Sequence, residues 1–174
     1  MKKIIGTLST ALLLCCNASY AADGFGAVRC GADVRKALVG QHMANDRVAA
    51  IEARHQDLKL KDLGGSELTA RLFLGSWMIC GSEYALLQDK GVIVDVLQVP
   101  AHSAQAPQYV GSCRIDGKEK PGTMIAILRN EQAAPDLAAS AAWSIDEKAK
   151  RFVALPTTGL RCPRDGVITA DGGR

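Results

Sequence analysis

Glu52 and His55 are the residues whose types and spacing come nearest to a reactive pair. On a helix, positions three apart share one face, so this carboxylate and imidazole could form an acid–base pair or ligate one metal ion. Asp57, His42 and His102 could complete such a site only if the fold brought them close. Catalytic zinc usually takes three protein ligands, and this spacing also arises often by chance. The sequence therefore predicts no metal site and no other cofactor, and it leaves a small hydrolase or metal-dependent enzyme that uses Glu52 and His55 as the alternative.

The motifs of the large catalytic families are missing from the sequence. It contains no Gly-x-Ser-x-Gly, no phosphate-binding glycine loop and no His-Glu-x-x-His. Gly75-Ser76 and Gly111-Ser112 each place a serine after a glycine, but both lie in segments that we predict to be strands. A nucleophilic serine of this kind needs a strand-to-helix turn. These observations favour a binding protein over an enzyme.

Four cysteines follow the N-terminal apolar segment, and none of them lies in a Cys-x-x-Cys pair. An even number of cysteines in an exported domain indicates disulfides, and four cysteines allow three pairings. We predict one bridge in each half of the chain, each closing a loop of about 50 residues. The crossed pairings stay open as alternatives. The predicted bridges are Cys30–Cys80 and Cys113–Cys162.

The first 21 residues have the layout of a secretory signal peptide. Lys2 and Lys3 form a basic start, Ile4–Cys16 is apolar, and Ser19-Tyr20-Ala21 is a small-x-small cleavage site. Cleavage after Ala21 would leave residues 22–174 as the mature chain. The sequence thus predicts a periplasmic or secreted protein.

Lipidation at Cys15 or Cys16 is the alternative fate of this segment. A lipid-attachment cysteine normally follows a small residue, whereas Leu14 precedes Cys15. The two thiols are more simply the end of the apolar core of the signal peptide.

Composition limits the protein class further. Of 174 residues, 48% are hydrophobic and 22% are charged, which excludes a disordered chain. Beyond the signal segment no 18-residue stretch is apolar, so we expect no stable membrane insertion of the mature chain. Loss of Lys2 and Lys3 reduces the basic residues from 21 to 19, against 18 acidic ones. That balance provides no basic surface for nucleic acid.

Helix signals are confined to the first part of the mature chain. Asp33–Val39 predicts a short helix that Gly40 ends. Asp46 to about Gln56 predicts a second helix, capped by Asn45 or Asp46, with apolar residues at helical spacing. Leu58–Gly65 loses this period, so we expect a loop there.

The remaining chain predicts antiparallel strands and therefore an α+β fold, with two N-terminal helices packed on a mainly antiparallel sheet that two disulfides staple. Asp89-Lys90-Gly91 predicts a hairpin turn. We expect residues 22–174 to form a single domain; a subdomain break near 100–108 is the alternative. The predicted strands are Leu68–Ile79, Glu83–Gln88, Val92–Val99, Tyr109–Ile115, Thr123–Leu128, Ala141–Ile145 and Arg151–Leu155.

Two loops are the candidates for a contact surface. Pro100–Pro107 is polar and bounded by prolines, and it carries His102. Pro163–Gly166 begins directly after the predicted disulfide cysteine Cys162 and presents Arg164, and arginine is a favoured interface anchor. We therefore expect a non-enzymatic protein, in an inhibitor-like or envelope accessory role, that binds another macromolecule such as a protein of the cell envelope through His102 and Arg164.

Overall fold

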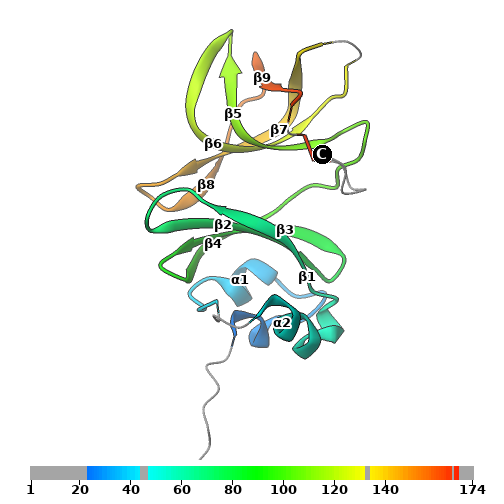
Figure 1. The fold of residues 1–174 in the computed structure, drawn as a ribbon, viewed down its shortest axis with the longest axis vertical. Coiled ribbons are helices and arrows are strands. Elements are labelled where there is room, and N and C mark those ends of the chain that lie inside the picture. Colours follow the sequence, from blue (N-terminus) through cyan, green and yellow to red (C-terminus); the bar gives the residue numbers. More distant parts are fainter. Residues whose placement is uncertain (1–22, 44–46, 132–133, 166, 169–174) are drawn as a thin grey trace, which may run out of the picture.

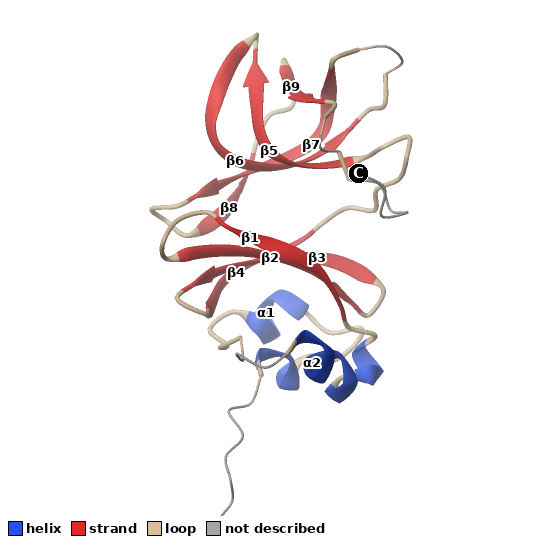
Figure 2. Cartoon of the chain, viewed as in Figure 1, coloured by secondary structure: helices blue, strands red, loops and turns tan. Residues whose placement is uncertain are grey.

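The computed structural model describes residues 23–43, 47–131, 134–165 and 167–168 (Figure 1). The predicted signal peptide, the predicted caps Asn45 and Asp46, and Gly166 lie outside these residues. Helices form one layer, a four-stranded sheet lies in the middle, and a five-stranded sheet lies on its other side (Figure 2). No helix in the described part of the chain has the length and apolar character needed to cross a membrane.

The predicted helices are present, but the second is shorter than expected. In the first, the Asp33 carboxylate caps the N-terminus by accepting a hydrogen bond from the Lys36 backbone N–H, 3.0 Å away. Gly40 follows that helix with φ of 86°, the conformation that glycine tolerates best. The second helix ends at Arg54, and a 3-10 turn follows after His55. The elements are η1 (Gly24–Ala27), α1 (Val34–Leu38), α2 (Val48–Arg54) and η2 (Gln56–Leu58).

The middle sheet is antiparallel throughout, with the strands in chain order. The hairpin predicted at Asp89-Lys90-Gly91 is confirmed. Lys90 and Gly91 have φ of 52° and 80°, as a two-residue turn with two left-handed positions requires. The strands are β1 (Lys61–Glu67), β2 (Leu72–Ile79), β3 (Ser82–Asp89) and β4 (Val92–Gln98).

The prediction of a loop at Leu58–Gly65 is wrong, because β1 begins at Lys61. Apart from half-buried Asp62, the side chains of β1 are exposed, so no apolar alternation marks it in the sequence. Backbone pairing with β2 holds β1 in place. The Glu52 carboxylate on α2 adds a further bond by accepting from the Asp62 N–H, 2.8 Å away. Tertiary pairing here overrides weak local propensity.

The second sheet was not separated from the first in the sequence prediction, which expected one sheet. Four of its five strands pair in a closed ring, β5–β6–β7–β9, and the fifth, β8, adds to β7. Strand β9 was not among the predicted strands. The strands are β5 (Gln108–Ile115), β6 (Lys118–Leu128), β7 (Asp136–Asp146), β8 (Arg151–Ala154) and β9 (Leu160–Pro163).

The hairpin between β5 and β6 is tighter than we predicted. Asp116 and Gly117 form its turn, with φ of 50° and 78°. Strand β6 therefore begins at Lys118 rather than Thr123, and Pro121-Gly122 lies within the strand. A register shift between Gly111 and Cys113 on β5 accommodates the extra length.

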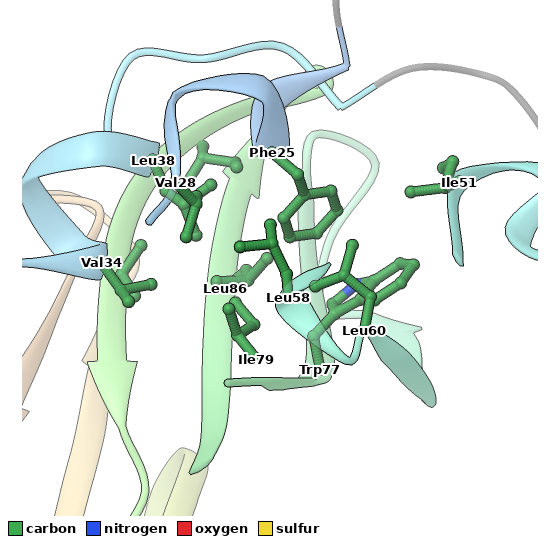
Figure 3. Packing of buried hydrophobic residues seen from close by; sticks show 12 residues of the cluster. Phe25, Val28, Val34, Leu38, Ile51, Leu58, Leu60, Trp77, Ile79 and Leu86 are labelled. Carbon is green, nitrogen blue, oxygen red and sulfur yellow. The ribbon is translucent and has the colours of Figure 1, made fainter. Parts of the chain in front are cut away.

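Apolar side chains on both faces of the middle sheet are buried. On one face Trp77, Ile79 and Leu86 form a cluster with side chains of the helical layer, among them Leu38 and Ile51 (Figure 3). Side chains on the other face form a second cluster with side chains of the five-stranded sheet. This cluster contains Leu74 and Leu87 from the middle sheet and Ile125 and Ile127 from the five-stranded sheet. A sheet covered on both faces has near-continuous apolar strands, which explains the unbroken apolar run in β3.

Both predicted disulfides are confirmed. Cys30 lies before α1 and Cys80 directly after β2, so the first bridge ties the helical layer to the middle sheet. Cys113 and Cys162 join β5 to β9 inside the closed ring. Two structural disulfides in one small chain are typical of an oxidising compartment outside the cytoplasm.

Candidate binding surface

His102 lies in the Pro100–Pro107 segment, which connects β4 to β5. Its Nε2 lies 2.8 Å from Oε2 of Glu83 at the start of β3. The other oxygen, Oε1, accepts a hydrogen bond of 3.0 Å from Gln108 Nε2. All three side chains are nearly buried, and Nδ1 of His102 has no hydrogen-bond partner among the described residues. His102 thus anchors the Pro100–Pro107 segment to β3, and the residues next to His102 form the side of the segment that faces away from β3.

Arg164 follows β9, and its guanidinium reaches the loop between β6 and β7. Its Nε donates to the Ala134 carbonyl at 2.8 Å, and its Nη1 donates to Asn130 Oδ1 at 3.0 Å. Its Nη2 donates to the Glu131 carbonyl. Arg164 therefore holds the β6–β7 loop in a defined position with three of its five N–H groups.

Asn130 joins the two loops that were predicted separately. Its side-chain Nδ2 donates to the Ala104 carbonyl at 2.8 Å, and its backbone N–H donates to the Gln105 carbonyl at 3.0 Å. The same residue accepts the bond from Arg164. The three segments form one surface, which we call the loop surface and define as residues 100–107, 129–131 and 163–165. It lies beside the junction of the two sheets (Figure 1).

Charges of both signs lie on and next to the loop surface. Arg161 on β9 pairs with Glu131, with 2.9 Å between Nη2 and Oε2, and both side chains are more than 40% exposed. Arg129 and Asp165 are also exposed, and neither side chain has an ion-pair partner within the described chain. The surface therefore presents mixed charge rather than a basic stripe.

The structure does not pair Glu52 with His55. Glu52 bonds to the Asp62 backbone, whereas His55 Nε2 lies 2.5 Å from Oδ1 of Asp23. The Asp23 side chain is buried and also accepts a bond from Arg54, so this cluster ties the start of the described chain to α2. Over the described ranges, no group of three or more His, Cys, Asp or Glu side chains could hold a metal ion.

The remaining members of that predicted site are dispersed. His42 forms a backbone bridge with Val92 at the start of β4, and Asp57 is exposed on η2. His102 lies with Glu83, next to the five-stranded sheet. The fold thus leaves these residues in separate environments.

The partners that hold the loop surface together were not predicted from the sequence. Asn130 has no signal in the sequence, because an exposed asparagine after a strand is common in any turn. Glu83 and Gln108 did carry a signal in the sequence. Each is a polar residue at the start of a strand whose other residues are largely apolar, and such residues when buried need a partner.

Comparison of the chain with protein-family models, with curated proteins and with solved structures found no match.

Proposed function

We propose that the chain is exported to the periplasm or secreted, and that its mature form binds another macromolecule without catalysing a reaction. The mature form would be residues 22–174, folded as a single α+β domain with the helices packed on the middle sheet. Its partner would be a protein of the cell envelope, in an inhibitor-like or accessory role. The basic and apolar start of the sequence supports export, as do the two disulfides.

The observation that carries this proposal is the position of Asn130 between the two candidate loops. It bonds to Ala104 and Gln105 on one side and to Arg164 on the other. Loops that are ordered before binding lose less conformational entropy when a partner arrives. Hydrogen bonds within the loop surface already fix its conformation. Such a surface is suited to binding a partner of fixed shape.

The charges of the loop surface favour a protein as the partner. Arg129 and Asp165 are both exposed, and the Arg161–Glu131 pair lies beside them. Electrostatic complementarity between proteins uses such mixed patterns to fix orientation, whereas nucleic acid selects a continuous basic surface.

We assign different parts in binding to the two residues that the sequence singled out. Arg164 has two N–H groups beyond the three that hold the β6–β7 loop, and these would anchor the partner. His102 would act by keeping the Pro100–Pro107 segment in place through Glu83.

Capture from a cell-envelope extract tests this proposal when it is compared with a matched surface variant. Gln105→Arg combined with Arg129→Glu changes two exposed side chains of the loop surface, neither of which forms an ion pair with any residue that the structure describes. We expect the wild-type chain to retain a specific protein that this variant does not retain. Lys148→Glu, in the exposed β7–β8 turn, is the control and should retain it fully. Equal capture by all three chains would refute the loop surface as the binding site.

The enzyme alternative makes the opposite prediction. If Glu52 and His55 carried a reaction, Glu52→Ala or His55→Ala would abolish activity while the chain stayed folded. The two side chains bond to different partners, Asp62 and Asp23, which favours the binding proposal.

A further inference from the structure

A groove of about 240 Å³ opens on the helical side of the middle sheet, away from the loop surface. Residues before and within α2 form one wall, among them Met43 and Val48, and strands β1 to β3 form the floor. Phe73 on β2 is 37% exposed at the floor, although it is a large apolar residue in a strand. The groove thus combines apolar walls with access from solvent.

Glycines remove the side chains that would otherwise fill this groove. Gly65 on β1 pairs directly with Gly75 on β2, and the Phe73 ring lies over both. A Cβ atom at Gly75 would lie 3.3 Å from the Phe73 ring, 3.4 Å from Gln88 Nε2 and 3.8 Å from Trp77 Nε1. Glycine within a strand often marks a place where a ligand or another backbone approaches closely. Three different side chains therefore converge on the space above Gly75.

Two of these side chains are largely buried and carry polar groups at the lining of the groove. Trp77 is 4% exposed and Gln88 is 8% exposed. Within the described part of the chain, neither the Trp77 indole N–H nor the Gln88 amide forms a hydrogen bond, and the polar atoms of both side chains remain accessible to solvent in the groove. A ligand in the groove would meet one indole donor and an amide that both donates and accepts.

Asp62 supplies an acceptor at the rim of the groove. Its Oδ1 accepts the Gly64 N–H at 3.0 Å, and its Oδ2 has no hydrogen bond within the described chain. Glu52 fixes the backbone of Asp62 from α2. Asp62 is the one charged residue among those that line the groove in the described chain, and its negative charge disfavours an anionic ligand.

We propose that this groove binds one ring of a neutral saccharide, a site independent of the loop surface. A sugar ring has an apolar C–H face, which would pack on Phe73, and hydroxyl groups that both donate and accept hydrogen bonds. Those hydroxyls satisfy the Trp77 N–H, the Gln88 amide and Asp62 Oδ2 together. The volume is below the roughly 300–1,000 Å³ of sites for drug-sized ligands, so it suits a single ring, alone or at the end of a longer glycan.

Nuclear magnetic resonance of the mature chain can test this proposal directly. The chain has two tryptophans, so its spectrum holds two indole N–H peaks, and a Trp143→Phe variant identifies which belongs to Trp77. The neutral probes are glucose, galactose, N-acetylglucosamine, cellobiose and diacetylchitobiose; glucuronate is the anionic probe. We expect at least one neutral probe to shift the Trp77 indole and Gln88 amide peaks saturably, with the Trp143 peak unmoved. Glucuronate should bind more weakly than glucose because of Asp62.

Two glycine substitutions provide a matched pair. Gly75→Ala places a methyl group where the three side chains converge and should weaken saccharide binding tenfold or more, about 1.4 kcal/mol. Gly26→Ala adds the same methyl group in η1, where nothing lies within 4 Å, and should leave binding unchanged. If Gly75→Ala does not give a folded spectrum, Gln88→Leu replaces it, and the same loss is expected.

Three outcomes would overturn the proposal. The first is the absence of a saturable shift with any neutral probe at about 100 mM, a hundredfold above a 1 mM Kd. The second is tighter binding of glucuronate than of glucose. The third is wild-type affinity in the folded variant, Gly75→Ala or Gln88→Leu.

Discussion

The Asp95 carboxylate on β4 accepts a hydrogen bond from the backbone N–H of Phe152 on β8, with 2.8 Å between Oδ2 and the nitrogen. Its other oxygen, Oδ1, accepts the Val96 N–H at 2.9 Å and lies 2.8 Å from the Arg35 guanidinium of α1. A single buried carboxylate therefore contacts both sheets and the helical layer. Contacts of this kind fix how the layers lie against one another.

Replacing Asp95 should destabilise the fold more than replacing its cationic partner. Asp95→Ala leaves the Phe152 N–H without its acceptor, which should lower the free energy of unfolding by about 1–3 kcal/mol. Arg35 is 65% exposed, so Arg35→Ala should cost less than about 1 kcal/mol. Urea denaturation at neutral pH measures both changes. Equal losses in the two variants would show that the ion pair, not the bond to Phe152, carries the effect.

A second carboxylate between the sheets predicts a pH dependence of stability. Lys150 Nζ lies 2.6 Å from Asp89 Oδ2, and Arg71 donates to both Asp89 oxygens. The hydrogen bond from Lys150 and then those from Arg71 hold the pKa of Asp89 below its ordinary value. Asp89 therefore stabilises the fold above about pH 4, and this contribution is lost as the pH falls through the lowered pKa.

Substitution of Asp89 tests that dependence. Asp89→Asn should be less stable than wild type at pH 7, and the difference should shrink as the pH falls below about 4. Asp165→Asn is the control, because Asp165 is exposed and without an ion pair in the described chain. Thermal unfolding between pH 7 and about 2 provides the comparison. A difference that stays constant over that range would contradict the role of the Asp89 charge.

The two disulfides should differ in their access to a reductant. Cys30 is exposed and Cys80 half-buried, whereas Cys113 and Cys162 are buried inside the closed ring of strands. Thiol–disulfide exchange requires access of the attacking thiolate to a sulfur. Mild reduction of the folded chain should therefore open Cys30–Cys80 first, as alkylation and peptide mapping would show. Earlier alkylation of Cys113 or Cys162 would contradict the buried position of that bridge.

Loss of either bridge should be costly in the unfolding equilibrium. The bridges span sequence separations of 50 and 49 residues, so each should contribute about 4 kcal/mol by restricting the unfolded chain. The paired substitution Cys113→Ala with Cys162→Ala should accordingly lower the free energy of unfolding by about 2–5 kcal/mol. A loss below about 1 kcal/mol would mean that the closed ring is held by packing alone.

Local signals in the sequence predicted the elements that depend on local chemistry. Asp33 caps α1, and Lys90-Gly91 turns the hairpin, as their residue types require. Strand β1 was not predicted because its own residues carry no apolar period and only pairing with β2 holds it in place. Strand β9 was not predicted because it has only four residues and depends on pairing with the distant strands β5 and β7. The contact of Asn130 with both loops likewise depends on how β6 and β9 are placed, which no nearby residue encodes.

Maturation can be checked on the exported protein. Asp23 would be the second residue after cleavage at Ala21, and its side chain is already buried against His55 and Arg54. We expect intact mass and N-terminal sequencing to give a chain that begins at Ala22 and carries no lipid. A mature chain that begins at a diacylated Cys15 or Cys16 would contradict this and place the protein on a membrane surface.

Affinity for the captured partner is the measurement that tests the binding proposal most directly. Arg164→Ala removes an anchor and should raise the Kd about thirtyfold, equivalent to about 2 kcal/mol. Asn130→Ala unlinks the two loops and should raise it about tenfold. Lys148→Ala, in the β7–β8 turn, should leave it unchanged. Wild-type Kd values for both Arg164→Ala and Asn130→Ala would contradict the proposal that the loop surface binds the partner.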